Sequence, residues 1–316
     1  MQDIDNLVNR LSLRLPSPIQ QLPVDWCPEG NLSVYVKRDD LIHPIISGNK
    51  WRKLQGHLTR SPQLSKQALP RQIVSFGGGY SNHLHSLGYC CQQLNIKLHA
   101  IVRGNYQLNP TPMLQDIENW GANIHYVTKM EYQQRHDNVY LEQLSQTYPE
   151  ALIIPEGGSD EQALEGVANI IAELSSEPNY QFDYILCPVA SGGTLAGLNQ
   201  AIYDTKLSTK LIGIAVLKGA VLEGEDYLEE LVEKLQSPNV PKATILHDYH
   251  CGGYAKAPDY LKDFCSQFNA QYGIPVEPVY SGKLFYALKQ LIESGYFPAQ
   301  SRILILHTGG LQGARV

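Results

Sequence analysis

Residues 184–202 read YILCPVASGGTLAGLNQAI, and this stretch decides the fold class. Tyr184–Val189 is a short, continuous apolar run, which is typical of a strand buried on both faces of a parallel sheet. Ser191, Gly192, Gly193 and Thr194 follow directly, and a helical pattern begins at Leu195. Such a loop presents free N–H groups at the positive end of a helix, which suits a phosphate group. A purely structural turn stays open, because the loop matches neither G-x-G-x-x-G nor the Walker A sequence.

The same alternation of short apolar runs and amphipathic stretches covers the rest of the chain. Further strands are predicted at Val34–Lys37, Ile73–Phe76, Leu98–Val102, Ile124–Val127, Leu152–Ile154, Leu211–Val216 and Ile303–Leu306. Helices are predicted from about Lys50 and at Leu84–Leu94, Thr111–Trp120, Glu161–Leu174, Leu195–Ile202, Glu223–Leu235, Ala257–Phe268 and Lys283–Glu293. This alternation predicts an α/β fold with mostly parallel sheet.

Two glycine-containing segments interrupt the alternation, Pro44–Gly48 and Pro155–Ser159. Their separation indicates a smaller domain inserted in a larger one. We therefore expect a smaller domain over residues 47–157 and a larger domain formed by residues 1–46 and 158–316. The length of 316 residues agrees with two domains.

Composition excludes several function classes. The chain has 25 Lys+Arg against 31 Asp+Glu, a net charge of −6, and 43% hydrophobic residues, so we expect a globular protein without a nucleic-acid-binding surface. No apolar run approaches the ~20 residues that span a bilayer. Asp3 and Asp5 stand where a signal peptide would be basic, so a cytoplasmic protein is expected. The six cysteines contain no C-x-x-C pair and are expected to be buried, apolar and free: Cys27, Cys90, Cys91, Cys187, Cys251 and Cys265.

Two segments carry candidate chemistry near the start of the chain. Lys50, in SGNKWRKL, follows a chain-breaking Gly-Asn pair, and a lysine at such a loop-to-helix edge can be a desolvated, nucleophilic amine. A solvated helix start is the alternative. The second segment, SFGGGYSNH, ends a strand in three glycines before Ser81, Asn82 and His83. Glycines allow close approach of a flat ligand, although a plain turn also explains them.

Three later segments add candidates. Tyr254 follows CGG, and Tyr280 lies in EPVYSGK. The sequence HTGG, from His307 to Gly310, follows the last predicted strand, where ligands of open α/β sheets gather. Packing roles for both tyrosines stay open. The chain has no G-x-S-x-G elbow and no H-E-x-x-H. His83 and His85 could be metal ligands, but two histidines beside a helix cap are expected to be hydrogen-bonding residues, so no metal is expected.

Together these segments resemble the fold-type II pyridoxal-phosphate enzymes, the tryptophan-synthase β-like group. Within it the chain is most similar to the 1-aminocyclopropane-1-carboxylate deaminase and D-cysteine desulfhydrase family. The resemblance runs over nearly the whole chain, through KRDD (37–40), GNK (48–50), SNH (81–83), SGGT (191–194), PVY (278–280) and HTGG (307–310). It implies two α/β domains with pyridoxal 5'-phosphate in the cleft between them, a small amino-acid substrate and a homodimer.

The resemblance also implies a role for each matching residue. Lys50 would hold the cofactor through a Schiff base and Asn82 would bind its ring hydroxyl. Ser281 would lie beside the pyridine nitrogen. The phosphate and the rest of the cofactor would be held by Lys53, Ser191, Gly192, Gly193, Thr194, Thr308 and Gly309. Ser81, Asn82, His83, Tyr254 and Tyr280 would face the substrate, with Lys50, Ser81 and the two tyrosines as the catalytic set.

Ser281 separates the two activities of this family. The deaminases have glutamate at this position, where an acid holds a proton on the pyridine nitrogen and strengthens the electron sink. Serine favours the less demanding loss of an α-proton and a β-substituent, and His83 resembles the desulfhydrase pattern. The sequence therefore predicts a D-cysteine desulfhydrase that forms pyruvate, ammonia and sulfide. The alternatives are a cyclopropane deaminase, an enzyme acting on L-serine derivatives, and a non-catalytic amino-acid-binding protein. His85, where arginine is usual, leaves the substrate open.

Overall fold

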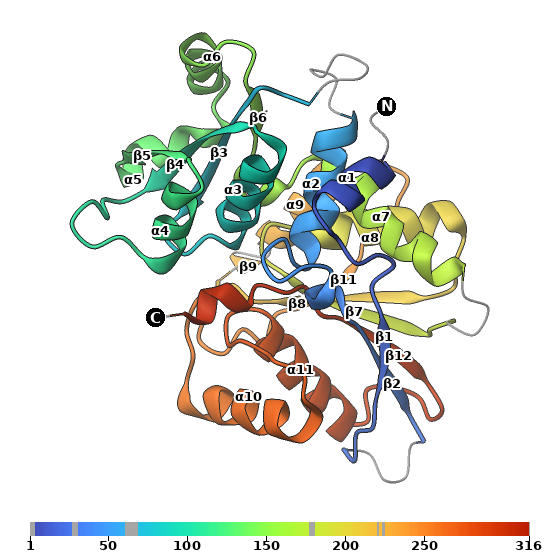
Figure 1. Cartoon of the computed structure of the whole chain (residues 1–316). Helices are drawn as coiled ribbons and strands as arrows, with labels where there is room; N and C mark the ends of the chain where they lie inside the picture. The colour runs from blue at the N-terminus through green and yellow to red at the C-terminus, as the bar shows by residue number, and fades with distance from the viewer. Residues whose placement is uncertain are drawn as a thin grey trace.

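The computed structural model describes residues 4–26, 31–60, 69–176, 181–219, 221–222 and 225–315. Two mostly parallel sheets organise this part of the chain (Figure 1). The six-stranded sheet has the order β1-β2-β12-β7-β8-β11, and the four-stranded sheet has the order β5-β4-β3-β6. Among the described helices, none has the length and apolar character needed to cross a bilayer.

The six-stranded sheet combines the two ends of the chain with its second half. Its strands are β1 (Ile19–Leu22), β2 (Ser33–Lys37), β7 (Tyr184–Val189), β8 (Lys210–Ala215), β11 (Thr244–Leu246) and β12 (Arg302–Leu306). Every pair in it is parallel except β1 with β2. The four-stranded sheet is parallel throughout and contains β3 (Gln72–Gly78), β4 (Lys97–Arg103), β5 (Asn123–Val127) and β6 (Leu152–Ile154). All eight strands predicted from the sequence are confirmed.

Eleven helices lie in the described residues: α1 (Ile4–Arg10), α2 (Asn49–Arg60), α3 (Asn82–Leu94), α4 (Pro112–Asn119), α5 (Lys129–Gln133), α6 (Asn138–Thr147), α7 (Glu161–Ser175), α8 (Gly193–Thr205), α9 (Tyr227–Leu235), α10 (Asp259–Tyr272) and α11 (Ser281–Glu293). Thr111 caps α4 as predicted, and its hydroxyl accepts from the Leu114 N–H. The predicted helix at Glu223–Leu235 was too long: Glu225–Asp226 form β10, which pairs with β9 (Val221–Leu222), and residues 223–224 lie outside the described residues. Short 3-10 turns are η1 (Asp39–Leu41), η2 (Gln134–His136), η3 (Glu156–Gly158) and η4 (Leu311–Ala314).

The six-stranded sheet is buried on both faces, as its continuous apolar strands predict. Along β7, Ile185, Cys187 and Val189 join the core under α7, α8 and α9, whereas Tyr184 and Leu186 join the core under α10 and α11. Figure 1 shows these two groups of helices on opposite sides of the sheet. Five of the six cysteines are buried and free, as expected, and Cys27 lies outside the described residues.

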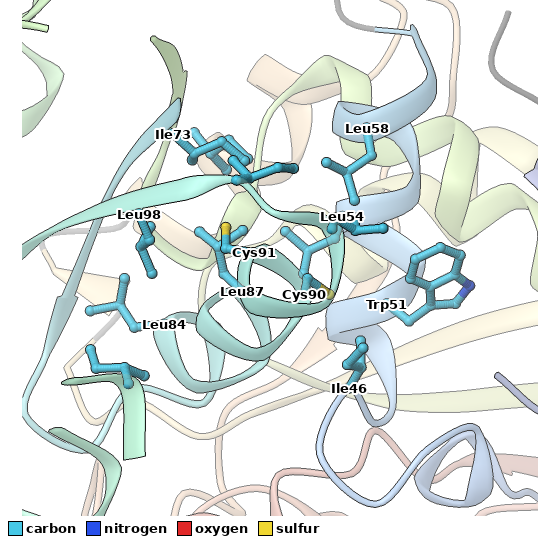
Figure 2. Packing of buried hydrophobic residues seen from close by; sticks show 14 of the residues in the cluster. Ile46, Trp51, Leu54, Leu58, Ile73, Leu84, Leu87, Cys90, Cys91 and Leu98 are labelled. Carbon is cyan, nitrogen blue, oxygen red and sulfur yellow. The ribbon is translucent and has the colours of Figure 1, made fainter. Parts of the chain in front are cut away.

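Helix α2 packs against both halves of the molecule. Leu54 and Leu58 belong to the core that α3 closes with Leu87 and Cys90, and Trp51, in the same cluster, points to the other side of α2 (Figure 2). Helix α2 also contacts α7, and there the two backbones touch directly. A Cβ added at Gly56 would lie 1.8 Å from the Gln162 carbonyl oxygen of α7, and one added at Gly166 would lie 1.8 Å from that of Arg52. If α2 and α7 moved apart, buried apolar side chains on either helix would lose their packing. The position of α2 between α3 and α7 is therefore fixed.

A buried ion-pair network fixes the same helix. Arg52 donates to Asp39 Oδ1 over 2.8 Å and to Glu173 Oε1 over 2.5 Å, and Lys37 donates to Glu173 Oε2 over 2.5 Å. Burial disfavours the charged form of Asp39, but the Arg52 guanidinium outweighs burial and the pKa of Asp39 is lowered. The network therefore joins α2 to β2, η1 and α7.

Candidate active site

Lys50 lies at the meeting point of two helix starts. Its Nζ donates to Asn49 Oδ1 over 2.8 Å, and Asn49 Nδ2 donates to Thr194 Oγ1, also over 2.8 Å, at the start of α8. Burial lowers the pKa of Lys50 from 10.5 to about 8. About a tenth of a base with that pKa is unprotonated at pH 7. The lowered pKa and the hydrogen bond to Asn49 therefore favour a desolvated amine over a solvated helix start.

Lys53 is a buried cation surrounded by uncharged oxygens. Its Nζ donates to Ser159 Oγ over 2.7 Å, to the Gly157 carbonyl over 3.2 Å and to Ser191 Oγ over 3.3 Å. Burial, and then the Lys50 charge, lower the pKa of Lys53 well below its usual value. No carboxylate within the described part of the chain hydrogen-bonds to this ammonium. A buried ammonium in such surroundings is in an unfavourable state that a bound anion would relieve.

The start of α8 adds donors beside that ammonium. Gly192, the N-cap, has φ +73° and makes no side-chain cap. The Gly193 N–H donates to the Ser191 carbonyl over 2.9 Å, and the next N–H groups of the helix can point to a ligand. A Cβ at Gly193 would lie 2.9 Å from Ser159 Oγ and 3.3 Å from Lys53 Nζ, so a larger residue would fill the space next to both donors. A helix N-terminus, two serine hydroxyls and an ammonium fit a phosphate group.

Two of the three glycines at the end of β3 and just after it have a structural explanation. A Cβ at Gly77 would lie 2.7 Å from Ser81 Oγ, and one at Gly79 would lie 2.7 Å from the Tyr106 ring. These two glycines are thus required by packing within the protein, and close ligand approach is not needed to explain them. Ser81 caps α3 by accepting from the Leu84 N–H over 3.1 Å, which leaves its own hydroxyl hydrogen available.

The HTGG segment contacts both Lys50's helix and Asn82. A Cβ at Gly48 would lie 1.8 Å from the Thr308 carbonyl oxygen, and one at Gly309 would lie 2.4 Å from Ser47 Oγ. A Cβ at Gly310 would lie 2.7 Å from Asn82 Nδ2. Segments from three distant parts of the sequence therefore meet here in van der Waals contact.

His83 is neutral and has one free acceptor. The Ser75 hydroxyl donates to the Ile154 carbonyl over 2.8 Å, so at its 2.8 Å contact with His83 Nε2 the histidine is the donor. His83 Nδ1 is then unprotonated, and it is buried without a partner among the described residues. Burial, followed by the charge of Lys50, lowers the pKa of His83 well below its usual value. Nδ1 lies beside Gly158, whose added Cβ would be 3.4 Å away.

The two tyrosines form a pair. Tyr280 OH lies 3.0 Å from Tyr254 OH, and the ring of Tyr254 is half exposed. The loop that carries Tyr254 is held from below by Lys283, whose buried Nζ donates to the Gly253 carbonyl over 2.6 Å. Burial and then the neighbouring Tyr254 raise the pKa of Tyr280. No hydrogen bond within the described ranges joins this pair to Lys50.

Ser281 is fully buried at the start of α11. Its Oγ accepts from the Glu277 N–H over 2.9 Å and lies 3.3 Å from Glu277 Oε1. The Glu277 carboxylate also accepts from the N–H groups of Val279, Tyr280 and Ser281. Serine at this position is thus backed by a carboxylate, which the sequence analysis did not anticipate.

Sequence reasoning missed further residues that shape the site, namely Asn49, Ser159, Lys283 and Gln312. Ser159 had a usable signal. It follows Gly157-Gly158 just after the predicted strand Leu152–Ile154, much as the SGGT loop follows Tyr184–Val189. Lys283 and Gln312 act through tertiary contacts that no local pattern indicates.

Known proteins with similar sequences identify the family. The family model described as "Pyridoxal-phosphate dependent enzyme" matches residues 14–309. A Pyrococcus horikoshii protein, provisionally named 1-aminocyclopropane-1-carboxylate deaminase, is 30% identical over 299 residues, which are 94% of this chain and 90% of the relative. The bifunctional mitochondrial D-cysteine desulfhydrase/1-aminocyclopropane-1-carboxylate deaminase of Arabidopsis thaliana is 28% identical, covering 95% of this chain and 77% of its own.

A solved structure agrees with these relatives. It is described as a homologue of the deaminase, is 27% identical and superposes with a TM-score of 0.78 over 99% of this chain and 96% of its own. The match to an enzyme family decides against the non-catalytic binding protein that the sequence left open. With the parallel sheets and the phosphate-fitting donors described above, the chain belongs to the fold-type II pyridoxal-phosphate-dependent enzymes, in the family that contains 1-aminocyclopropane-1-carboxylate deaminases and D-cysteine desulfhydrases.

Proposed function

We propose that the protein is a D-cysteine desulfhydrase, which converts D-cysteine and water into pyruvate, ammonia and hydrogen sulfide. The observation that carries this proposal is Ser281 at the position where the deaminases of this family have glutamate. A serine hydroxyl cannot hold a proton on the pyridine nitrogen as an acid does, so the ring opening of a substrate without an α-hydrogen suffers most. Elimination of a β-thiol needs a weaker electron sink.

One group of residues in the site would bind the cofactor. Lys50 would hold pyridoxal 5'-phosphate covalently. Its phosphate would be held by Lys53, Ser191, Gly192, Gly193 and Thr194, with Ser159 as an addition from the structure. Asn82 would bind the ring hydroxyl, Ser281 would face the pyridine nitrogen, and Thr308 and Gly309 would support the ring. When bound, the cofactor supplies an electron sink for the α-carbon of the substrate.

Protein groups supply binding and proton transfer. The free hydroxyl hydrogen of Ser81 and the N-terminus of α3 suit the substrate carboxylate. Lys50, with a pKa of about 8, can accept the α-proton at neutral pH. Tyr280 stays protonated because its pKa is raised, so the Tyr254–Tyr280 pair suits protonation of the departing sulfur. His83 Nδ1 offers an acceptor to a substrate N–H.

An assay with two substrates tests the proposal. We expect the purified protein to release pyruvate and sulfide from D-cysteine, and to form little 2-oxobutyrate from 1-aminocyclopropane-1-carboxylate. Lys50→Ala should abolish turnover, whereas Lys262→Ala, an exposed lysine of α10, should not change it. Turnover of the cyclopropane substrate alone would contradict the proposal and favour the deaminase. Sulfide release from L-cysteine alone would favour an enzyme of L-configured substrates.

Three further expectations belong to this proposal. They are the inserted smaller domain at residues 47–157, a homodimer and a cytoplasmic location. Sedimentation velocity of the purified holoenzyme tests the homodimer. A species of twice the chain mass of 35.3 kDa is expected, and a monomer at micromolar concentration would contradict it.

A further inference from the structure

The C-terminal turn η4 crosses from the six-stranded sheet to the helices of the four-stranded sheet. Figure 1 shows this turn, in red, on the side of the molecule where α4 lies. Arg315 Nη2 donates to Asp116 Oδ2 of α4 over 2.6 Å and lies 3.1 Å from His85 Nε2 of α3. Gln312 donates from Nε2 to Asn82 Oδ1, at the first residue of α3. The turn therefore holds the end of α3 that carries Asn82.

The contacts of Gln312 fix which way its amide points. Arg315 can only donate, so the Gln312 atom that faces Arg315 Nη2 at 3.3 Å is the oxygen Oε1. The Tyr80 carbonyl can only accept, so the atom facing it at 3.4 Å is the nitrogen Nε2. Both contacts give the same orientation, and Nε2 is the atom that reaches Asn82.

This orientation is passed on to Asn82. A donor at Gln312 Nε2 requires an acceptor opposite it, so Asn82 presents Oδ1 to Gln312 and turns Nδ2 the other way. Nδ2 lies against Gly310 and has no hydrogen-bond partner among residues 4–315 that the structure describes. Arg315 donates to both Asp116 and Gln312, and Gln312 donates to Asn82, so one series of hydrogen bonds runs from Arg315 through Gln312 to Asn82 and ends in a free donor.

We propose that Gln312 is a positioning residue that sets Asn82 as a hydrogen-bond donor toward the ring oxygen of the cofactor. The inference rests on the proposed role of Asn82. A donor at this place stabilises the ionised ring oxygen, whereas an acceptor would stabilise the protonated hydroxyl. Arg315 acts indirectly, because its hydrogen bond to Gln312 Oε1 sets the orientation of the Gln312 amide. Asp116 acts by holding Arg315.

The substitution Gln312→Glu tests the direction of the hydrogen bond between residue 312 and Asn82. A carboxylate at position 312 can only accept, so Asn82 must rotate its amide to donate to it and present Oδ1 to the ring oxygen. Gln93→Glu, an exposed glutamine at the far end of α3, is the matched control for the added charge. The readouts are the absorption spectrum of the bound cofactor and the lysine labelled by borohydride reduction.

We expect both variants and the wild type to carry the label on Lys50. Only Gln312→Glu should lose visible absorption in favour of the near-ultraviolet band, and its cofactor should bind about tenfold more weakly. A Gln312→Glu spectrum identical to that of Gln93→Glu, with Lys50 labelled in both, would overturn the inference and leave the proposed function intact.

A label absent from wild-type Lys50 would instead refute the proposed function. The hydrogen-bond direction is then decided on the apoprotein with a double-mutant cycle of Asn82→Asp and Gln312→Glu. In the Asn82→Asp variant the new carboxylate can still accept from Gln312, but in the double variant two carboxylates cannot share one hydrogen bond. If the unfolding temperature of the double variant falls by more than the sum of the two single decreases, the Gln312–Asn82 hydrogen bond is supported. Additive decreases overturn it.

Discussion

The side-chain amide of Asn49 donates to Thr194 Oγ1 over 2.8 Å, across 145 residues of sequence. The same amide accepts from Lys50 Nζ through its oxygen. Asn49 thus joins Lys50 to the start of α8, whose donors fit a phosphate, and fixes their relative position.

Asn49→Ala should weaken cofactor binding roughly tenfold, because loss of one buried hydrogen bond costs about 1–1.5 kcal/mol. The measurement is titration of the apoprotein with pyridoxal 5'-phosphate, followed by absorbance. Asn199→Ala, which removes hydrogen bonds on the far part of α8, is the control and should bind normally. Equal affinities of the two variants would contradict the role given to Asn49.

Lys53→Met should separate phosphate recognition from ring recognition. Loss of a charge-assisted hydrogen bond is expected to weaken pyridoxal 5'-phosphate binding about 10- to 100-fold. Binding of pyridoxal, which lacks the phosphate, should hardly change. The apoprotein should keep or gain stability, because burial already penalises the Lys53 ammonium. A similar loss for both ligands would place Lys53 elsewhere in the site.

Lys50 should make the stability of the apoprotein depend on pH. Its pKa is about 8 in the folded protein against 10.5 in the unfolded chain, so between these values the unfolded state binds more protons. The contribution of Lys50 to the free energy of unfolding therefore rises with pH over this window. Lys50→Met removes the effect, so its stability advantage over the wild type at pH 7 should shrink toward pH 10. Urea unfolding measures this gap, and a constant gap would contradict the shifted pKa.

Arg52→Ala should lower the free energy of unfolding by about 3–5 kcal/mol, because it removes the guanidinium partner of the buried Asp39 carboxylate and leaves Glu173 with Lys37 alone. Arg71→Ala, at an exposed arginine, should cost less than about 0.5 kcal/mol. Part of the network is also lost in acid. Since the pKa of Asp39 is lowered on folding, its stabilising contribution is present above the unfolded value of 3.8 and disappears as pH falls below it. Equal stabilities of the two variants would rule out a structural role for the network.

Ser281→Glu should be poorly tolerated alone, because its carboxylate would lie beside that of Glu277. In the double variant with Glu277→Gln, the amide oxygen of residue 277 can still accept from the N–H groups of Tyr280 and residue 281. The repulsion between two carboxylates is then absent. We expect this double variant to raise the ratio of 2-oxobutyrate formed from the cyclopropane substrate to pyruvate formed from D-cysteine at least tenfold. An unchanged ratio would show that residue 281 does not select the substrate.

The sequence predicted the strands well because most of them are buried on both faces. Tyr184–Val189 and Leu152–Ile154 are continuous apolar runs, and the structure has them with the same bounds. It did not predict β1 or β11. Ile19–Leu22 contains two glutamines and lies at the antiparallel edge, and Thr244–Leu246 is a three-residue edge strand. Edge strands depend on their neighbours more than on their own apolar pattern.

Candidate site residues were predictable where they stand in local motifs. Lys50, Ser81 and the SGGT loop each follow a chain break or a strand end, and the structure has them at helix starts. Gln312 and Lys283 gave no such signal, because each acts through long-range hydrogen bonds. The Glu277–Ser281 contact lies within five residues, yet it was missed because the sequence alone does not say that both side chains are buried.

The central claim is that Lys50 carries pyridoxal 5'-phosphate as a Schiff base. Borohydride reduction of the purified protein followed by peptide mapping tests it most directly. The account predicts a single labelled peptide containing Lys50, and loss of the label in Lys50→Ala. A label on Lys53 or on any other lysine, or a protein that takes up no cofactor, would contradict it.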